Sequence, residues 1–132
     1  MESHFSAVGW LTPTSRAAVR KLVEILRGEN LFLMIVGHTD SDPVRNPTLR
    51  GRGINDNLHL SLLRSKAVLD EMQRAGYPAM LMFPTGWGEL RPIAPNTTAA
   101  NKKLNRRVEI LVDPAASNIF GISSITGLEP SF

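Results

Sequence analysis

The chain has 132 residues, 42% of them hydrophobic and 20% charged, which is typical of a globular domain rather than of a disordered or fibrous protein. It contains no cysteine, which excludes disulfides, thiolate metal sites and thiol nucleophiles. Basic residues exceed acidic ones by only three and aromatic residues make up 6%, so a nucleic-acid-binding surface is a minority interpretation despite a pI of about 9.8.

Neither a membrane span nor a leader peptide is visible. The longest apolar run, residues 31–37, is far shorter than the roughly 20 residues of a membrane helix. The first residues, MESHF, lack the basic and apolar regions of a signal peptide. We therefore expect a membrane tether or targeting element, if there is one, to lie on sequence outside this chain.

The first predicted elements are a helix and a central strand. A helix over residues 15–27 follows the capping sequence Thr12-Pro13-Thr14 and places its apolar residues mostly on one side. Residues 31–36 are continuously apolar, which predicts a strand buried on both faces in the middle of a sheet. This strand ends abruptly at residues 37–40, Gly-His-Thr-Asp.

A long segment, residues 41–57, comes next and is predicted to be irregular because prolines and glycines recur along it. Loops of this length inside a compact domain are often functional. A second helix is predicted over residues 58–75. Arg64 lies about 90° from the centre of its apolar face, so we expect the arginine at the rim of the domain rather than in its core.

The remaining pattern alternates short strands and turns. We predict a strand over residues 80–83, one or two helical turns over residues 98–105 and a strand with unequal faces over residues 106–112. The whole order favours the α/β class, as a two-layer α+β sandwich with helices laid against a mixed sheet. Residues 115–132 show no clear period, so we divide the chain into a domain, 1–114, and a C-terminal tail.

The residues contain no recognisable catalytic machinery. The three histidines, His4, His38 and His59, share no helical spacing and have no supporting carboxylate pattern, which argues against a metal site. No serine elbow is present, and the glycine pairs at 51–53 and 86–88 complete no phosphate or dinucleotide motif. We therefore expect neither an enzyme nor a cofactor.

A polar site can nevertheless be built from Asp40 and Arg64. Asp40 follows the buried strand, at the carboxyl edge where open sheets place ligands, and Arg64 is near the start of the next helix. A carboxylate and a guanidinium facing one pocket would complement a zwitterion. From spacing alone, the simpler interpretation is favoured, in which the two side chains pair with each other or with solvent.

Four sequence motifs, in the order expected for one known family, favour the ligand-binding interpretation of Asp40 and Arg64. They are GHTD at 37–40, NLHLSLLR at 57–64, GWGE at 86–89 followed by PIA and Asn96, and NRRVEI at 105–110. Together they resemble the OmpA-like (OmpA/MotB C-terminal) peptidoglycan-binding domain family over roughly residues 5–112. The resemblance implies a βαβαβ-type fold with a mixed sheet and helices packed on one face.

The resemblance also implies a function. It is non-catalytic binding of peptidoglycan in the periplasm through the meso-diaminopimelate of the stem peptide, which anchors an envelope protein or complex to the cell wall. By match to the family's motifs, Asp40 takes the diaminopimelate ammonium and Arg64 its carboxylate. Asn57 and Arg107 would support the pocket, and Thr39 would make a backbone or hydroxyl contact. Arg106 is assigned no role.

Two questions stay open within this interpretation. The loop between Asp40 and Asn57 is longer than in the compact OmpA and Pal type, and its start resembles MotB-type stator proteins or the peptidoglycan-binding extension of type VI secretion TssL proteins. The alternative function is an assembly or dimerisation domain of an envelope machine, with a pocket that does not bind the wall. The partner expected is peptidoglycan, and a homodimer is left open as an alternative. No nucleic acid is expected, and a membrane only through a segment absent from this chain.

Overall fold

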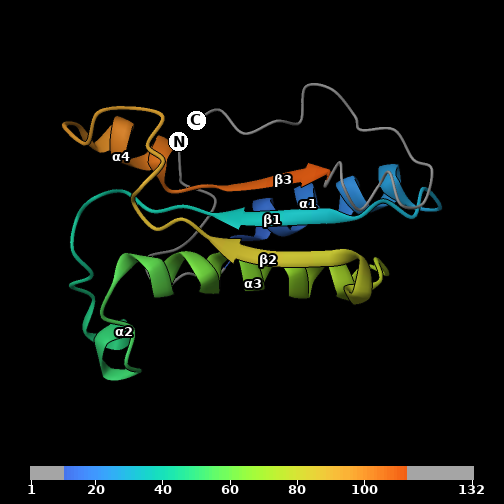
Figure 1. Ribbon diagram of the computed structural model, residues 1–132, viewed down its shortest axis with the longest axis horizontal. Helices are drawn as coiled ribbons and strands as arrows, with labels where there is room; N and C mark the ends of the chain where they lie inside the picture. Colours follow the sequence, from blue (N-terminus) through green and yellow to red (C-terminus); the bar gives the residue numbers. More distant parts are fainter. Residues whose placement is uncertain (1–10, 113–132) are drawn as a thin grey trace.

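The computed structural model describes residues 11–112, in which three strands form one mixed sheet (Figure 1). The sheet order is β2-β1-β3, with β1 parallel to β2 and antiparallel to β3. The elements in chain order are α1 (Pro13–Leu26), β1 (Leu33–Gly37), α2 (Pro47–Gly51), α3 (Asn57–Arg74), the 3-10 turn η1 (Ala79–Leu81), β2 (Met82–Gly86), α4 (Ala99–Asn105) and β3 (Val108–Val112).

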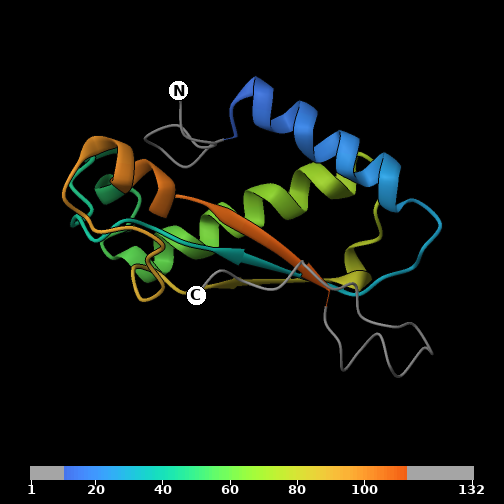
Figure 2. The same cartoon turned by 90° about the horizontal axis from the view of Figure 1, so that it is seen from above.

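The predicted fold class is confirmed. Figure 2 shows α1 and α3 on the same side of the sheet, so that the described residues form two layers. Helix α3 packs on β1 and β2, and α1 packs against α3. None of the helices within residues 11–112 is long and apolar enough to cross a membrane.

The core lies between the sheet and the two long helices. Leu33 and Ile35 of the central strand β1 are at most 1% exposed, as are neighbouring core positions such as Met72 of α3, while Val23 of α1 is 2% exposed. Burying each such side chain contributes roughly 1.5–3 kcal/mol. The predicted central strand is confirmed, and on the opposite face of β1 Val36 is buried as well, while Met34 is half-buried.

Two glycines let the start of α3 lie directly on the sheet. A Cβ at Gly37, the last residue of β1, would collide with the backbone carbonyl of Ser61 in α3. At Gly86, the last residue of β2, it would collide with the Ser61 hydroxyl. That hydroxyl donates to the Leu58 carbonyl oxygen at 2.7 Å and accepts from the Gly88 backbone N–H at 2.9 Å. The first turns of α3 are thus held against the ends of both strands.

The helix ends follow from capping side chains. The side chains of Thr12, Asp56 and Thr98 each accept a backbone N–H in the first turn of α1, α3 and α4. The helices predicted over residues 15–27 and 58–75 are confirmed to within two residues at each end, and the helical turns predicted over residues 98–105 are α4.

Two details of the prediction were wrong. The segment 41–57 is not wholly irregular, because it contains α2: Pro47 occupies the first turn, where its missing N–H costs nothing, and the Asn46 side chain caps the N–H groups of Thr48 and Leu49. The strand predicted over residues 80–83 begins two residues later and runs to Gly86. Its Pro84 is tolerated because β2 is an edge strand of the described sheet.

The tail predicted over residues 115–132 lies outside the described residues, so the domain boundary at residue 114 stays a prediction.

Candidate functional site

A polar cavity of about 160 Å³ lies where the chain leaves β1 and enters α3. Figure 1 shows the end of β1, the segment that carries α2 and the start of α3 converging at one edge of the fold. The lining comes from these segments and from the residue after α4. It consists of Thr39, Asp40, Asp42, Pro43, Val44, Arg45, Asn46, Leu49, Asn57, Leu60, Arg64 and Arg106.

The segment before α3 is held in place by its own small core. Val44, Leu49, Ile54 and Leu60 are all buried and form a second apolar cluster, separate from the main core. The Asn57 amide donates to the Asp42 carbonyl oxygen at 3.1 Å, which ties the start of α3 to the start of the segment. The long loop is therefore a structured wall of the cavity.

Arg64 is buried, contrary to the expectation that it would reach the rim. Its side chain is covered because α3 lies close to the glycine ends of the strands, and the whole residue is only 4% exposed. Its Nη1 donates to the His38 carbonyl oxygen at 3.0 Å. Burial lowers the pKa of Arg64 to about 10, with Asp40 opposing the shift and Arg106 adding to it, so the guanidinium remains charged at neutral pH.

Asp40 lies on the same cavity and is already engaged by the protein. Its Oδ1 accepts the backbone N–H of Asp42 at 3.0 Å, in a turn that fixes the carboxylate. Its Oδ2 accepts Nη1 of Arg106 at 2.7 Å. The ion-pair partner of Asp40 is therefore Arg106, while Nη1 of Arg64 is bonded to the His38 carbonyl oxygen.

Arg106 is one of three charged lining residues that were absent from the predicted site, together with Asp42 and Arg45. It follows the last residue of α4 and precedes β3, with φ −82° and ψ 86°, so neither the helical nor the strand period places its side chain. The resemblance assigns a pocket role to Arg107 and none to Arg106, whereas the structure has Arg106 in the lining.

Arg107 does not line the cavity, although Thr39, Asp40, Asn57 and Arg64 do. Its Nε donates to Glu109 Oε1 at 3.0 Å and its Nη2 donates to the Arg91 carbonyl oxygen at 2.9 Å. The Arg107 side chain thus braces β3 against the loop after β2.

His38 belongs to the same brace. It is fully buried, its Nε2 lies 2.8 Å from Glu109 Oε1, and its backbone N–H donates to the Arg107 carbonyl oxygen at 2.9 Å. Burial lowers the pKa of His38 to about 4, with the charge of Arg107 contributing and Glu109 opposing, so the imidazole is neutral at pH 7. Because the His38 carbonyl holds Arg64, the brace positions a group that faces the cavity.

The outer rim is a second small network. Oδ1 of Asp42 accepts a hydrogen bond from Nδ2 of Asn96 at 3.0 Å, and Oδ2 of Asp42 lies 3.1 Å from Nζ of Lys102. The hydrogen bonds from Lys102 and Asn96 lower the pKa of Asp42. Buried Thr39 donates its hydroxyl to the Asp40 carbonyl oxygen at 2.8 Å. These contacts link the wall of the cavity to α4 and to the loop before it.

Chemically, the cavity can recognise charge. Three arginines and two aspartates face it, and the described lining contains no histidine, serine, cysteine or lysine that would make a nucleophile and base pair. Within residues 11–112, no three His, Cys, Asp or Glu side chains are grouped so that they could hold a metal ion. The arrangement is suited to a ligand that carries both an ammonium and a carboxylate.

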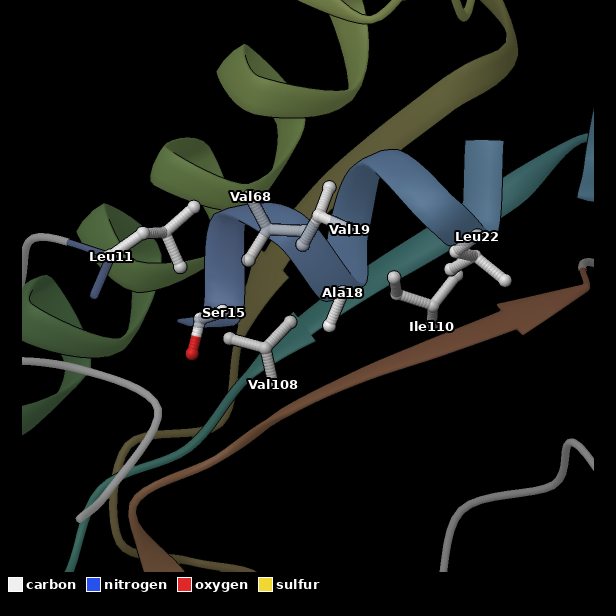
Figure 3. Close-up of a pocket in the computed structure, with 8 residues that line it drawn as sticks. All are labelled: Leu11, Ser15, Ala18, Val19, Leu22, Val68, Val108 and Ile110. Carbon is white, nitrogen blue, oxygen red and sulfur yellow. The ribbon is translucent and has the colours of Figure 1, made fainter. Parts of the chain in front are cut away.

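A second cavity, of about 180 Å³, has the opposite character. It is a groove between α1 and β3, and Figure 3 shows side chains of both elements lining it together with Val68 of α3. The lining residues are Leu11, Ser15, Ala18, Val19, Leu22, Val68, Val108 and Ile110. Ser15 is the one polar residue of this lining, so the groove has no group that would recognise a charged ligand.

The fold and the polar cavity define a two-layer α/β domain that presents paired charges at the carboxyl edge of its sheet. The chain belongs to the OmpA family, whose sequence model matches residues 9–106.

Curated relatives include proteins of motility and of the outer membrane. Motility protein B of Bacillus subtilis is 34% identical over 83 residues, covering 62% of this chain and 30% of that protein. The outer-membrane lipoprotein YfiB of Pseudomonas aeruginosa is 32% identical over 103 residues, covering 77% and 56%. The chain thus spans only 30 to 56% of the length of these relatives.

Solved structures agree with this assignment. A MotB-like protein from Desulfovibrio vulgaris is 30% identical, with a TM-score of 0.68 over 80% of this chain and 64% of that one. The cell wall anchor of the type VI secretion system from Pseudomonas aeruginosa is 25% identical, with the same TM-score over 80% and 70%. The C-terminal domain of Helicobacter pylori MotB, at 18% identity, shows the fold alone, with a TM-score of 0.74 over 91% of both chains.

Proposed function

We propose that this domain binds peptidoglycan without cleaving it, by holding the meso-diaminopimelate of the stem peptide, and so anchors an envelope protein to the cell wall. The observation that carries the proposal is the presence of Asp40 and the buried Arg64 in the lining of one cavity. A similar structure described as a cell wall anchor supports it.

The free end of diaminopimelate carries an ammonium and a carboxylate on one carbon. Arg64 would donate its guanidinium fork to the carboxylate, and Asp40 would accept the ammonium. Arg64 is already desolvated and bonded to the His38 carbonyl, so little rearrangement of this side chain is needed. The ammonium would share Asp40 with Arg106 or displace it from Oδ2.

The other predicted residues would support this contact from different places. Asn57 and Thr39 line the cavity, but their side chains already bond to the backbone of residues 40–42, so we assign them to shaping the wall. Arg107 would act from outside the lining, as a positioning residue that braces β3 and the backbone of His38.

The expected affinity of a single domain is low. Hydrogen bonds to charged groups contribute about 1.5–3 kcal/mol each, and two of them must offset the cost of ordering a flexible peptide. The cell wall repeats its stem peptide densely, so several tethered domains would be retained through effective concentration. This fits an anchor in the periplasm, tethered to a membrane by sequence outside this chain.

One observation favours the alternative of an assembly domain with a closed pocket. Asp40 is already paired with Arg106 at 2.7 Å, so the acceptor proposed for the ammonium is occupied by the protein itself. Binding experiments on intact cell wall distinguish the two functions, because an assembly domain would remain in the supernatant.

The test is co-sedimentation with purified sacculi. We expect the domain to pellet with diaminopimelate-type sacculi, and Asp40→Ala and Arg64→Ala to stay in the supernatant. A matched control, Asp70→Ala, removes an acid on α3 whose ion-pair partner is Lys66, and it should pellet like the native protein.

Lysine-type sacculi are the matched ligand control, because lysine keeps the ammonium of diaminopimelate and lacks the carboxylate beside it. We expect little sedimentation with them. Circular dichroism would show that each variant is folded. Equal sedimentation of native protein and both variants, or equal sedimentation with the two wall types, would rule out the proposed site.

A further inference from the structure

The polar cavity holds more positive charge than a zwitterion needs. Both of its acids are neutralised by the protein: Asp40 is paired with Arg106, and Asp42 with Lys102, at 2.7 and 3.1 Å. Arg45 faces the same cavity, and within residues 11–112 it makes no hydrogen bond or ion pair. A net positive charge is therefore left at the exposed side of the cavity.

The backbone at Arg45 is fixed in position, although the side chain is exposed. Val44 before it is 7% exposed and packs in the second apolar cluster, and its carbonyl oxygen accepts Nη1 of Arg50 at 3.2 Å. Asn46 after it caps α2. The backbone on both sides of Arg45 is thus held, so binding an anion would cost only the rotamer freedom of the Arg45 side chain and no further ordering of the backbone.

Ligand binding would leave this excess of positive charge uncompensated. The zwitterionic end of diaminopimelate is neutral overall, so its arrival adds no negative charge to the cavity. Its ammonium competes with Arg106 for the Asp40 carboxylate, which leaves Arg106 with less of its ion pair. Arg106 and Arg45 together would then lack a matching anion.

We propose that Arg45, with Arg106, forms a second carboxylate subsite, so that the cavity selects stem peptides carrying a free carboxylate besides the diaminopimelate zwitterion. The inference rests on the proposed function. In the stem peptide, the γ-linked D-glutamyl residue next to diaminopimelate offers such a carboxylate, and converting it to the carboxamide removes the charge with little change of shape. The site therefore distinguishes the acid from the amide form of the wall.

Two synthetic peptides test this subsite. Both contain N-acetyl-γ-D-glutamyl-meso-diaminopimelate. One carboxyl group of diaminopimelate is joined to the next residue in the cell wall, and in both peptides this group is capped as an amide. They differ only in the α-substituent of the glutamyl residue, which is a carboxylate in one and a carboxamide in the other. Affinities are measured by NMR titration of the native domain and of Arg45→Gln at low salt.

We expect the native domain to bind the acid peptide about three- to tenfold more tightly than the amide peptide, which is the range of one or two exposed charge pairs. In Arg45→Gln this ratio should fall close to one. The control is Arg27→Gln, which makes the same charge change at the opposite end of α3, where Arg27 donates to the Ala75 carbonyl oxygen, and it should keep the native ratio.

The outcomes separate this inference from the proposed function. If the native domain bound both peptides equally and Asp40→Ala abolished this binding, the second subsite would be overturned. The diaminopimelate site would remain supported. A ratio that persists in Arg45→Gln would also overturn it, because the selection would come from another residue. If neither peptide bound at all, the proposed function would fall, and the subsite with it.

Discussion

The two cavities of this domain are similar in size and opposite in kind. The polar cavity has about 160 Å³ and is faced by five charged side chains, whereas the groove between α1 and β3 has about 180 Å³ and none. Most residues that line the groove belong to helices and strands. Those from α1 recur with the helical period, and those from β3 alternate along the strand. The polar cavity is built mainly from residues at the ends of elements and between them. Size alone would therefore not point to the cavity in which we propose that the ligand binds.

The contrast also shows where each kind of group can be held. Aliphatic side chains in the groove need only a matching surface, and a helix packed near a strand supplies one. Arg64 needs partners for a buried charge, and these come from the carbonyl of His38 and the nearby Asp40. Such partners are available at the end of β1 because the backbone leaves the sheet there.

The largest effect on stability is expected at the contact between Gly37 of β1 and Ser61 of α3, which sets how closely α3 packs on the sheet. Gly37→Ala would push a methyl group into the Ser61 carbonyl, and α3 would have to move away from β1. We expect a loss of about 3 kcal/mol in the free energy of unfolding, measured by urea denaturation. Gly51→Ala is the matched control, because nothing lies within 4 Å of an added Cβ there. Equal stability of the two variants would contradict the close packing of α3.

The second prediction separates the cavities. Val68→Ala removes two methyl groups from the wall of the groove, where Val68 is 3% exposed. We expect a loss of about 2 kcal/mol in the free energy of unfolding, with sedimentation on diaminopimelate-type sacculi unchanged while the protein is folded. If the folded variant lost wall binding as Asp40→Ala is expected to, the groove would belong to the ligand site.

The smallest expected effect is a pH dependence that belongs to the polar end. Burial lowers the pKa of His38 from 6.5 to about 4, and Arg107 adds to the shift. Between these two values the unfolded chain holds a proton that the folded chain lacks, so stability falls as the pH is lowered through this window. We expect a loss of about 1 to 2 kcal/mol between pH 7 and pH 4.5.

Urea denaturation of His38→Gln at the two pH values checks the origin of this loss. In His38→Gln the free energy of unfolding should change less between pH 7 and pH 4.5 than in the native protein. In Val68→Ala the free energy of unfolding should be lowered by the same amount at both pH values. An unchanged slope in His38→Gln would mean that another group titrates in this window. Asp42, whose pKa is lowered by Lys102 and Asn96, acts only at more acidic pH.

Most of the fold could be predicted because hydrophobic periodicity and capping residues are local signals. The two long helices, the central strand β1 and the last strand follow from such patterns, and so does the α/β class. The short helix α2 was missed because Pro47 was interpreted only as a breaker, whereas beside Asn46 it begins a helix. The start of β2 was misplaced because the 3-10 turn over Ala79–Leu81 resembles a strand in composition.

The site was predicted less completely, for physical reasons. Helical geometry placed Arg64 at the edge of an apolar face, but its burial depends on how closely Gly37 allows α3 to approach the sheet. The pairing of Asp40 with Arg106 joins residues 66 positions apart, and no local period encodes it. Arg107, assigned to the pocket by resemblance, is not part of its lining, because its side chain is bonded to Glu109 and to the Arg91 carbonyl oxygen instead.

The central claim is that Arg64 receives the diaminopimelate carboxylate, and its guanidinium can be observed directly. The measurement is an NMR titration of the Arg64 side-chain N–H signals, assigned by their loss in Arg64→Lys, with soluble muropeptides of the diaminopimelate and lysine types. We expect the Arg64 signals to show a saturable shift with the diaminopimelate type only, while the methyl signals of Val68 and Ile110 in the groove stay in place. No shift of Arg64, or equal shifts with both muropeptides, would contradict it.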